Sequence, residues 1–266
     1  NYNQLKIPIG LVLLFLMGIG PLLSWNYTSQ SVLLNRFKLP LSISFLSGLG
    51  YIIFSSLFQL YVFVAIMGVS FTLSSILGEF YKSFKKQKNS SNFLHSIVKM
   101  FLSNRHKNGG YIVHIGIVLL FIGFIGRAFE VEKEFSLSPG EQIYFSNYVF
   151  KLNSIKSEAR DNHYAFLSEI DVVDSSTNQL LTNLKPEKRI YFYWNSDPEK
   201  RQPHSELDIY STIQKDIYSI FSGYDAQKNI GYFKIMINPL VNWVWIGGVL
   251  MVIGSLFAFW PSRRNS

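Results

Sequence analysis

The chain has 266 residues and no cysteine, which excludes thiolate catalysis, thiolate metal sites and disulfides. Its formal net charge of +8 is unevenly divided: residues 131–234 carry 12 Lys and Arg against 15 Asp and Glu, a net of −3, and the remainder carries 13 against 2, a net of +11. The positive excess lies in short loops beside apolar segments, where lipid headgroups and membrane topology explain it, so it does not indicate nucleic-acid binding.

The N-terminal part of the chain is dominated by apolar segments. The first, residues 5–25, is long enough to cross a bilayer, for which about 20 apolar residues suffice. Residues 39–79 are apolar over 41 positions, too many for one span, so we predict spans at 39–57 and 60–79 with a tight turn near Ser55–Gln59. The alternative, one span plus a re-entrant piece, would move the N-terminus to the other side of the membrane.

A basic loop follows these spans. Residues 81–108 contain seven Lys or Arg and no acidic residue, which predicts a cytoplasmic loop. A Lys-rich site for lipid or a partner is the alternative interpretation of these charges. Apolar residues within the loop recur at helical spacing and predict a short amphipathic helix on the inner membrane face: Phe93, Leu94, Ile97, Val98 and Phe101.

The predicted span at residues 109–129 contains His114, the one ionisable side chain placed well inside a spanning segment. Such a residue is costly in a membrane and marks a candidate functional site. Three apolar residues share its helical face: Val118, Phe121 and Ile125. Gly116 and Gly123 lie on the opposite face, where another helix could approach closely. A neutral imidazole here could ligate a haem iron, relay a proton or hydrogen-bond a neighbouring backbone.

The only long polar part of the chain follows this span, and its sequence pattern predicts β structure. Alternating apolar and aromatic residues predict strands, separated by turn signals, in FSLSPGEQIYF, NYVFKLNSI, YAFLSEIDVV and RIYFYW. About 100 residues of this kind predict a small β sandwich or barrel. A last span, Val241–Trp260, has tryptophans at both ends, and Arg263 and Arg264 place its C-terminal end on the cytoplasmic side.

The predicted fold class is therefore an α-helical polytopic membrane protein with an inserted β-rich extracytoplasmic domain. We expect a membrane domain over residues 1–130, a periplasmic β-rich domain over 131–238, and a last span with a cytoplasmic tail over 239–266. The N-terminus is then outside and the C-terminus inside.

The other histidines carry no recognisable site motif. His95 and His106 lie in the basic loop and are expected to be solvated, and His163 and His204 are expected at the surface of the β domain. There is no HxxxH or HExxH metal spacing, no GxSxG and no Walker-type glycine-rich loop. No catalytic residue is therefore predicted.

Four segments together resemble one family: MGIGPLLSW (17–25), NGGYIVHIGIVLLFIGFIG (108–126), LKPEKRIY (184–191) and KIMINPLVNWVWIGGVLMVIGSLFAFWP (234–261). These segments, and the order of spans, basic loop, histidine span, polar domain and last span, are similar to the C-terminal part of CcmF-type cytochrome c biogenesis proteins. That family is the haem lyase component of the bacterial cytochrome c maturation system. The resemblance covers nearly the whole chain.

The resemblance implies a cofactor role for His114. In that family the histidine of the GGYIVHIG context is one axial ligand to the iron of a membrane b-type haem, and the second ligand comes from an earlier span. A tryptophan-rich WWD motif flanked by two external histidines holds the haem that is delivered, and neither is present in this sequence. We therefore expect half of a haem b site and no delivery site here, the remainder lying on missing or separate polypeptide.

The implied function is that of a component of the lyase that attaches haem to apocytochrome c in the periplasm. Implied partners are the inner membrane, the remainder of the haem lyase, the holo haem chaperone, and apocytochrome c with its presenting thiol-reductase or chaperone subunit. Two alternatives remain. One is a non-haem scaffold that docks chaperone and apocytochrome through residues 131–234. The other is a proton-pathway or transporter subunit using His114, which is weakened because no other ionisable residue lies deep in a span.

Overall fold

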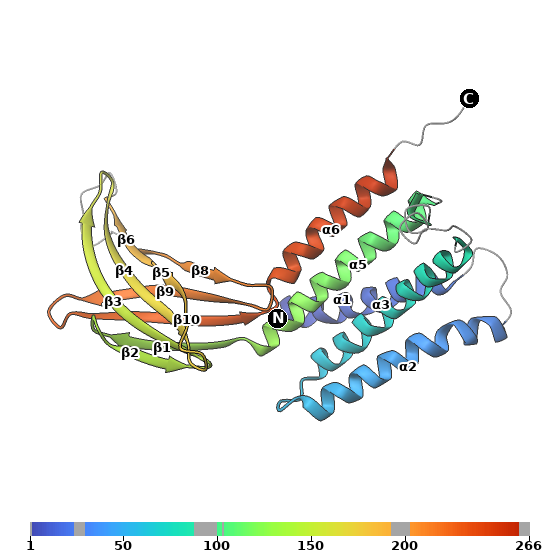
Figure 1. Ribbon diagram of the computed structural model, residues 1–266, viewed down its shortest axis with the longest axis horizontal. Helices are drawn as coiled ribbons and strands as arrows, with labels where there is room; N and C mark the ends of the chain where they lie inside the picture. The colour runs from blue at the N-terminus through green and yellow to red at the C-terminus, as the bar shows by residue number, and fades with distance from the viewer. Residues whose placement is uncertain (1, 24–29, 88–99, 103, 193–202, 261–266) are drawn as a thin grey trace. The chain divides into compact units, whose positions relative to one another are not determined.

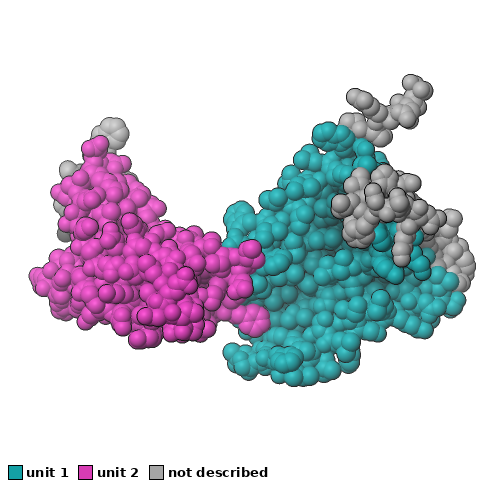
Figure 2. Space-filling model, in the orientation of Figure 1, with its two compact units in different colours: residues 1–128, 240–266 teal, residues 129–239 magenta. Residues whose placement is uncertain are grey.

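The computed structural model describes residues 2–23, 30–87, 100–102, 104–192 and 203–260. They belong to two compact units, one of residues 1–128 with 240–266 and one of residues 129–239 (Figure 2). Most of the amphipathic helix predicted in the basic loop lies outside the described residues, as do His95, Arg263 and Arg264.

The first unit consists of helices (Figure 1): α1 (Tyr2–Ile19), α2 (Gln30–Phe54), α3 (Leu60–Gln87), α5 (Arg105–Gly126) and α6 (Asn242–Phe259), with short 3-10 turns at Gly20–Leu22 and Arg127–Phe129. Five segments built on these helices are long and apolar enough to cross a membrane. The chain turns between α2 and α3 at residues 55–59, where Ser55 and Tyr51 side chains both donate to the Leu57 carbonyl.

Helices α5 and α6 pack along a seam of small residues. A Cβ atom added at Gly116 would lie 2.6 Å from the Gly247 carbonyl oxygen, and one added at Gly254 would lie 2.8 Å from the Val113 nitrogen. Gly109 faces Ala258 and Gly123 faces Val244 in the same way. Small residues spaced by seven therefore let the two backbones touch, which confirms the predicted close approach of another helix.

The opposite face of α5 packs against α1 and α3. Val118 of α5 forms a buried cluster with Leu14 of α1 and Val69 of α3, and Phe121 and Ile125 pack against that cluster. The Thr72 hydroxyl of α3 donates to the Leu14 carbonyl at 2.8 Å, which ties α3 to α1 inside the apolar packing. The face that carries His114 is thus turned toward other helices.

The second unit is a pair of antiparallel sheets. One sheet has the order β1-β10-β9-β8 and the other β2-β3-β4-β6-β7, with β5 also paired to β4. The strands are β1 (Val131–Leu137), β2 (Gln142–Phe145), β3 (Tyr148–Ala159), β4 (His163–Asp174), β5 (Leu180–Leu184), β6 (Glu187–Tyr191), β7 (Pro203–Glu206), β8 (Asp208–Ser211), β9 (Lys215–Asp225) and β10 (Ile230–Pro239).

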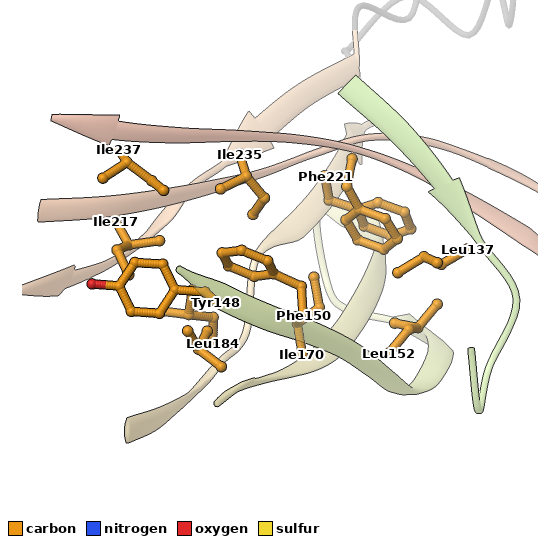
Figure 3. Close-up of a cluster of buried hydrophobic side chains, with 12 residues drawn as sticks. Leu137, Tyr148, Phe150, Leu152, Ile170, Leu184, Ile217, Phe221, Ile235 and Ile237 are labelled. Atoms are coloured by element: carbon orange, nitrogen blue, oxygen red, sulfur yellow. The ribbon is translucent and has the colours of Figure 1, made fainter. Parts of the chain in front are cut away.

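The inner faces of both sheets supply one core (Figure 3). Phe150 and Leu152 of β3 are fully buried while Lys151 between them is exposed, which is the period of two that predicted a strand. Phe221 of β9 and Phe233 of β10 stack at 4.8 Å between ring centroids. The unit is thus a β sandwich, and the predicted fold class of a polytopic helical protein with an inserted β-rich domain is confirmed.

Candidate functional site

His114 lies on α5, about two and a half turns from its start at Arg105, and its side chain is partly buried. Its Nδ1 atom is buried and has no hydrogen-bond partner among the residues that the structure describes. A buried polar atom without a partner costs about 1–3 kcal/mol, so such atoms are rare and require an explanation. The imidazole is therefore available to a group that these residues do not supply.

A pocket of about 1130 Å³ opens beside this imidazole. This volume exceeds the usual 300–1,000 Å³ of a small-ligand site. Its lining comes from the turn after α1 and from α2, α3 and the N-terminal part of α5 with its cap: Gly20, Pro21, Leu23, Arg36, Glu79, Lys82, Ser83, Lys85, Asn104, His106, Lys107, Gly110, Tyr111 and His114. The pocket therefore belongs entirely to the helical unit.

Charged residues surround the mouth of the pocket. Glu79 of α3 accepts hydrogen bonds from Lys82 at 2.9 Å and from Lys107 of α5 at 3.2 Å. Lys107, Tyr111 and His114 follow one another at helical spacing on α5, and the Lys107 ammonium lies 5.4 Å from the centroid of the Tyr111 ring. A polar row therefore leads from the ion pair along α5 to His114.

The start of α5 is held in place beside the pocket. Asn104 caps the helix by accepting from the Lys107 backbone nitrogen at 3.1 Å. The buried Asn108 side chain donates to the Met100 carbonyl at 2.7 Å and to the Phe101 carbonyl at 3.2 Å. These bonds satisfy backbone carbonyls of the preceding segment and connect it to the first turn of α5.

Of the other described histidines, His106 lines the same pocket, and His163 and His204 belong to the β unit. His106 is exposed, as predicted, and lines the pocket mouth. His163 is only 8% exposed, so its predicted surface position is wrong: strand β4 pairs with β6 and lays the imidazole 4.9 Å from the Tyr191 ring centroid. His204 is exposed, and its ring centroid lies 5.6 Å from that of Tyr191. The described residues contain no group of three or more His, Cys, Asp or Glu that could hold a metal ion.

The sequence indicates His114 as a site residue but does not indicate its neighbours in the pocket. Glu79, Arg36 and Lys85 reach the pocket from α2 and α3, and no periodicity within one helix shows which helices will be adjacent. The one available signal was Glu79, which is the only acidic residue among the first 129. An isolated carboxylate at the end of an apolar span requires a cationic partner, which Lys82 and Lys107 supply.

A comparison with protein families identifies residues 128–239 as a CcmF C-terminal beta-sandwich. Over nearly the whole chain the sequence is similar to the cytochrome c-type biogenesis protein CcmF of Haemophilus influenzae, with 23% identity across 98% of this chain and 38% of that protein. The probable cytochrome c-type biogenesis protein NrfE of Escherichia coli is 25% identical across 58% of this chain and 26% of its own length.

The fold is also that of a solved structure, the cytochrome c heme lyase CcmF, with a TM-score of 0.76 and 20% identity across 98% of this chain. This chain covers 40% of that structure and 38% of the Haemophilus relative, so it spans well under half of the length of these proteins. The resemblance found in the sequence is confirmed, and this chain is related to the C-terminal part of the CcmF-type cytochrome c biogenesis proteins.

Proposed function

We propose that this chain is a component of a cytochrome c haem lyase and that His114 supplies one axial ligand to the iron of a membrane haem b. The observation that carries the proposal is the position of His114, an imidazole inside an apolar helix that lines a pocket of about 1130 Å³. The similarity to proteins named for cytochrome c biogenesis and to a structure named a heme lyase supports the same conclusion.

The residues present fit such a group. A neutral imidazole offers one nitrogen lone pair as a ligand, which is the usual protein contribution to haem iron. The glycine seam fixes the rotation of α5 against α6, so that His114 faces the pocket and Val118 packs on α1 and α3. When bound, the haem would supply one-electron redox chemistry, and His114 would hold and orient it.

The second ligand and the surface that holds the delivered haem lie, in this proposal, on polypeptide outside this chain. Sequence supports this, because the only histidine within a span is His114 and no WWD motif occurs. The Lys and Arg asymmetry supports an inner-membrane protein with residues 81–108 in the cytoplasm and residues 129–239 in the periplasm. The β sandwich is then placed to dock the haem chaperone and apocytochrome c.

The His114→Ala variant tests the ligand assignment in the purified full-length assembly. We expect the absorption bands of a low-spin haem b to disappear and the haem content, measured as the pyridine haemochrome, to fall to background. His106→Ala is the matched control, because His106 lines the same pocket but is exposed at the rim. A low-spin spectrum that persists in a correctly assembled His114→Ala protein would contradict the proposal and favour a proton-relay or structural role.

Deleting residues 131–234 tests the docking role of the sandwich. Because the helical unit has its own packing and contains the whole pocket, we expect the haem spectrum to be retained. Capture of apocytochrome c and of the haem chaperone on the immobilised assembly should be lost. Undiminished capture by the deletion variant would assign docking to another part of the assembly.

A further inference from the structure

We propose that Arg36 and Lys85, assisted by Lys82, bind the propionate carboxylates of the haem that His114 ligates. The inference rests on the proposed function and adds to it the residues that recognise the acidic edge of the cofactor. It concerns side chains of α2 and α3, elements that the family resemblance did not assign to any site.

The pocket lining carries a net positive charge. The lining holds four permanent cations, Arg36, Lys82, Lys85 and Lys107, and one carboxylate, Glu79, a net of 4 − 1 = +3. Glu79 pairs with Lys82 and Lys107, whereas Arg36 and Lys85 pair with no carboxylate among the described residues. Unpaired cations that converge on one pocket attract an anionic ligand and are selective for it.

The arrangement along α5 fits an amphiphile with an acidic edge. Lys107 at the mouth and His114 are seven residues apart, which corresponds to about 10 Å of helix rise. The lining therefore holds a cation and the imidazole about 10 Å apart along α5, a separation that suits a haem whose iron is central and whose carboxylates project from one edge. Arg36 is partly preorganised, since its guanidinium donates to the Leu22 carbonyl at 3.1 Å.

Haem fits this pocket better than a lipid does. A phospholipid headgroup would also satisfy the cations at the mouth, because phosphate and carboxylate share the same chemistry. It would leave the His114 imidazole, which lines the same pocket, without a bound group, since an acyl chain offers nothing that an imidazole can bind. We therefore assign the cations to the carboxylates of the ligand that also engages His114.

The experiment compares protohaem with its dimethyl ester, in which both propionates are blocked. The full-length assembly is produced in haem-deficient cells, purified in lipid nanodiscs and titrated with each porphyrin by absorption. Arg36→Gln/Lys85→Gln is compared with the wild type. The control is Lys38→Gln, which removes one positive charge from an exposed residue of α2 outside the pocket lining.

We expect the wild type and Lys38→Gln to bind protohaem about five- to tenfold more tightly than the ester, as one or two partly exposed charge pairs would give. The double variant should bind both forms with the affinity of the ester and keep its low-spin spectrum. Unchanged preference for protohaem in the double variant would overturn the inference. Loss of bound anionic phospholipid without loss of this preference, measured by native mass spectrometry, would overturn it in favour of a lipid site.

The outcome is separable from that of the proposed function. If His114→Ala abolishes the low-spin spectrum while Arg36→Gln/Lys85→Gln retains the preference for protohaem, only the propionate assignment fails. If His114→Ala keeps the spectrum, the ligand assignment fails whatever the ester titration shows.

Discussion

Gly247→Ala is expected to force α5 and α6 apart and to destabilise the helical unit, whereas Gly248→Ala is not. A Cβ atom at Gly247 would lie 2.5 Å from the Gly116 carbonyl oxygen and 3.0 Å from the Leu120 nitrogen. Both are backbone atoms, so no side-chain rotation relieves the clash. Overpacking of this kind costs about 1–3 kcal/mol. At Gly248 nothing lies within 4 Å, and alanine gains about 0.8–1 kcal/mol of helix propensity.

The protein is purified in mild detergent and unfolded by titration with SDS. The midpoint of unfolding is measured from the loss of the helical circular dichroism signal. The haem spectrum of the assembly is a second readout, because the same seam fixes the rotation of α5 that turns His114 toward the pocket. Gly247→Ala should lower the midpoint and weaken the low-spin bands, and Gly248→Ala should do neither. Equal midpoints for the two variants would mean that the helices do not pack through these glycines.

The periodicities of the sequence were sufficient to predict the seam and the histidine face. Gly116 and Gly123 are seven residues apart, and Val118 lies one turn from His114. The sequence of this one helix therefore shows which face carries small residues and which face carries the histidine with apolar residues. The same holds for β3, where Phe150 and Leu152 alternate with exposed residues. Local patterns of this kind carry enough information because they report one face of one element.

The features that the sequence does not predict depend on which helices and strands become neighbours in the fold. The pairing of Glu79 with Lys107 joins residues 28 positions apart on two helices, and nothing in either helix specifies the other as its partner. The burial of His163 arises from the β4–β6 pairing that places Tyr191 directly opposite it. The identity of His163 and the spacing of its neighbours in the sequence do not show that Tyr191 will lie across from it. The sequence alone therefore predicts a surface position for this histidine.

The second large effect is expected for Phe221→Ala in the β sandwich. Phe221 is fully buried, stacks on Phe233 at 4.8 Å with an interplanar angle of 12°, and belongs to the core that both sheets share (Figure 3). Truncating a buried phenylalanine costs about 3–5 kcal/mol, a large part of the 5–15 kcal/mol that stabilises a typical domain. Tyr144→Ala on β2 is the control, because that side chain is 65% exposed and should change stability by less than about 0.5 kcal/mol.

Urea denaturation of residues 129–239, followed by far-UV circular dichroism, measures both variants. Phe221→Ala should shift the midpoint strongly downward, because the cavity removes contacts from the core that both sheets share. In the full assembly the same variant should leave the haem spectrum intact, since the pocket and the glycine seam lie in the other unit. Gly247→Ala should therefore destabilise the helical unit and weaken the haem spectrum. Phe221→Ala should destabilise the β sandwich and leave the haem spectrum unchanged. A loss of haem caused by Phe221→Ala would show that the sandwich, and not the helical unit alone, maintains the ligand site.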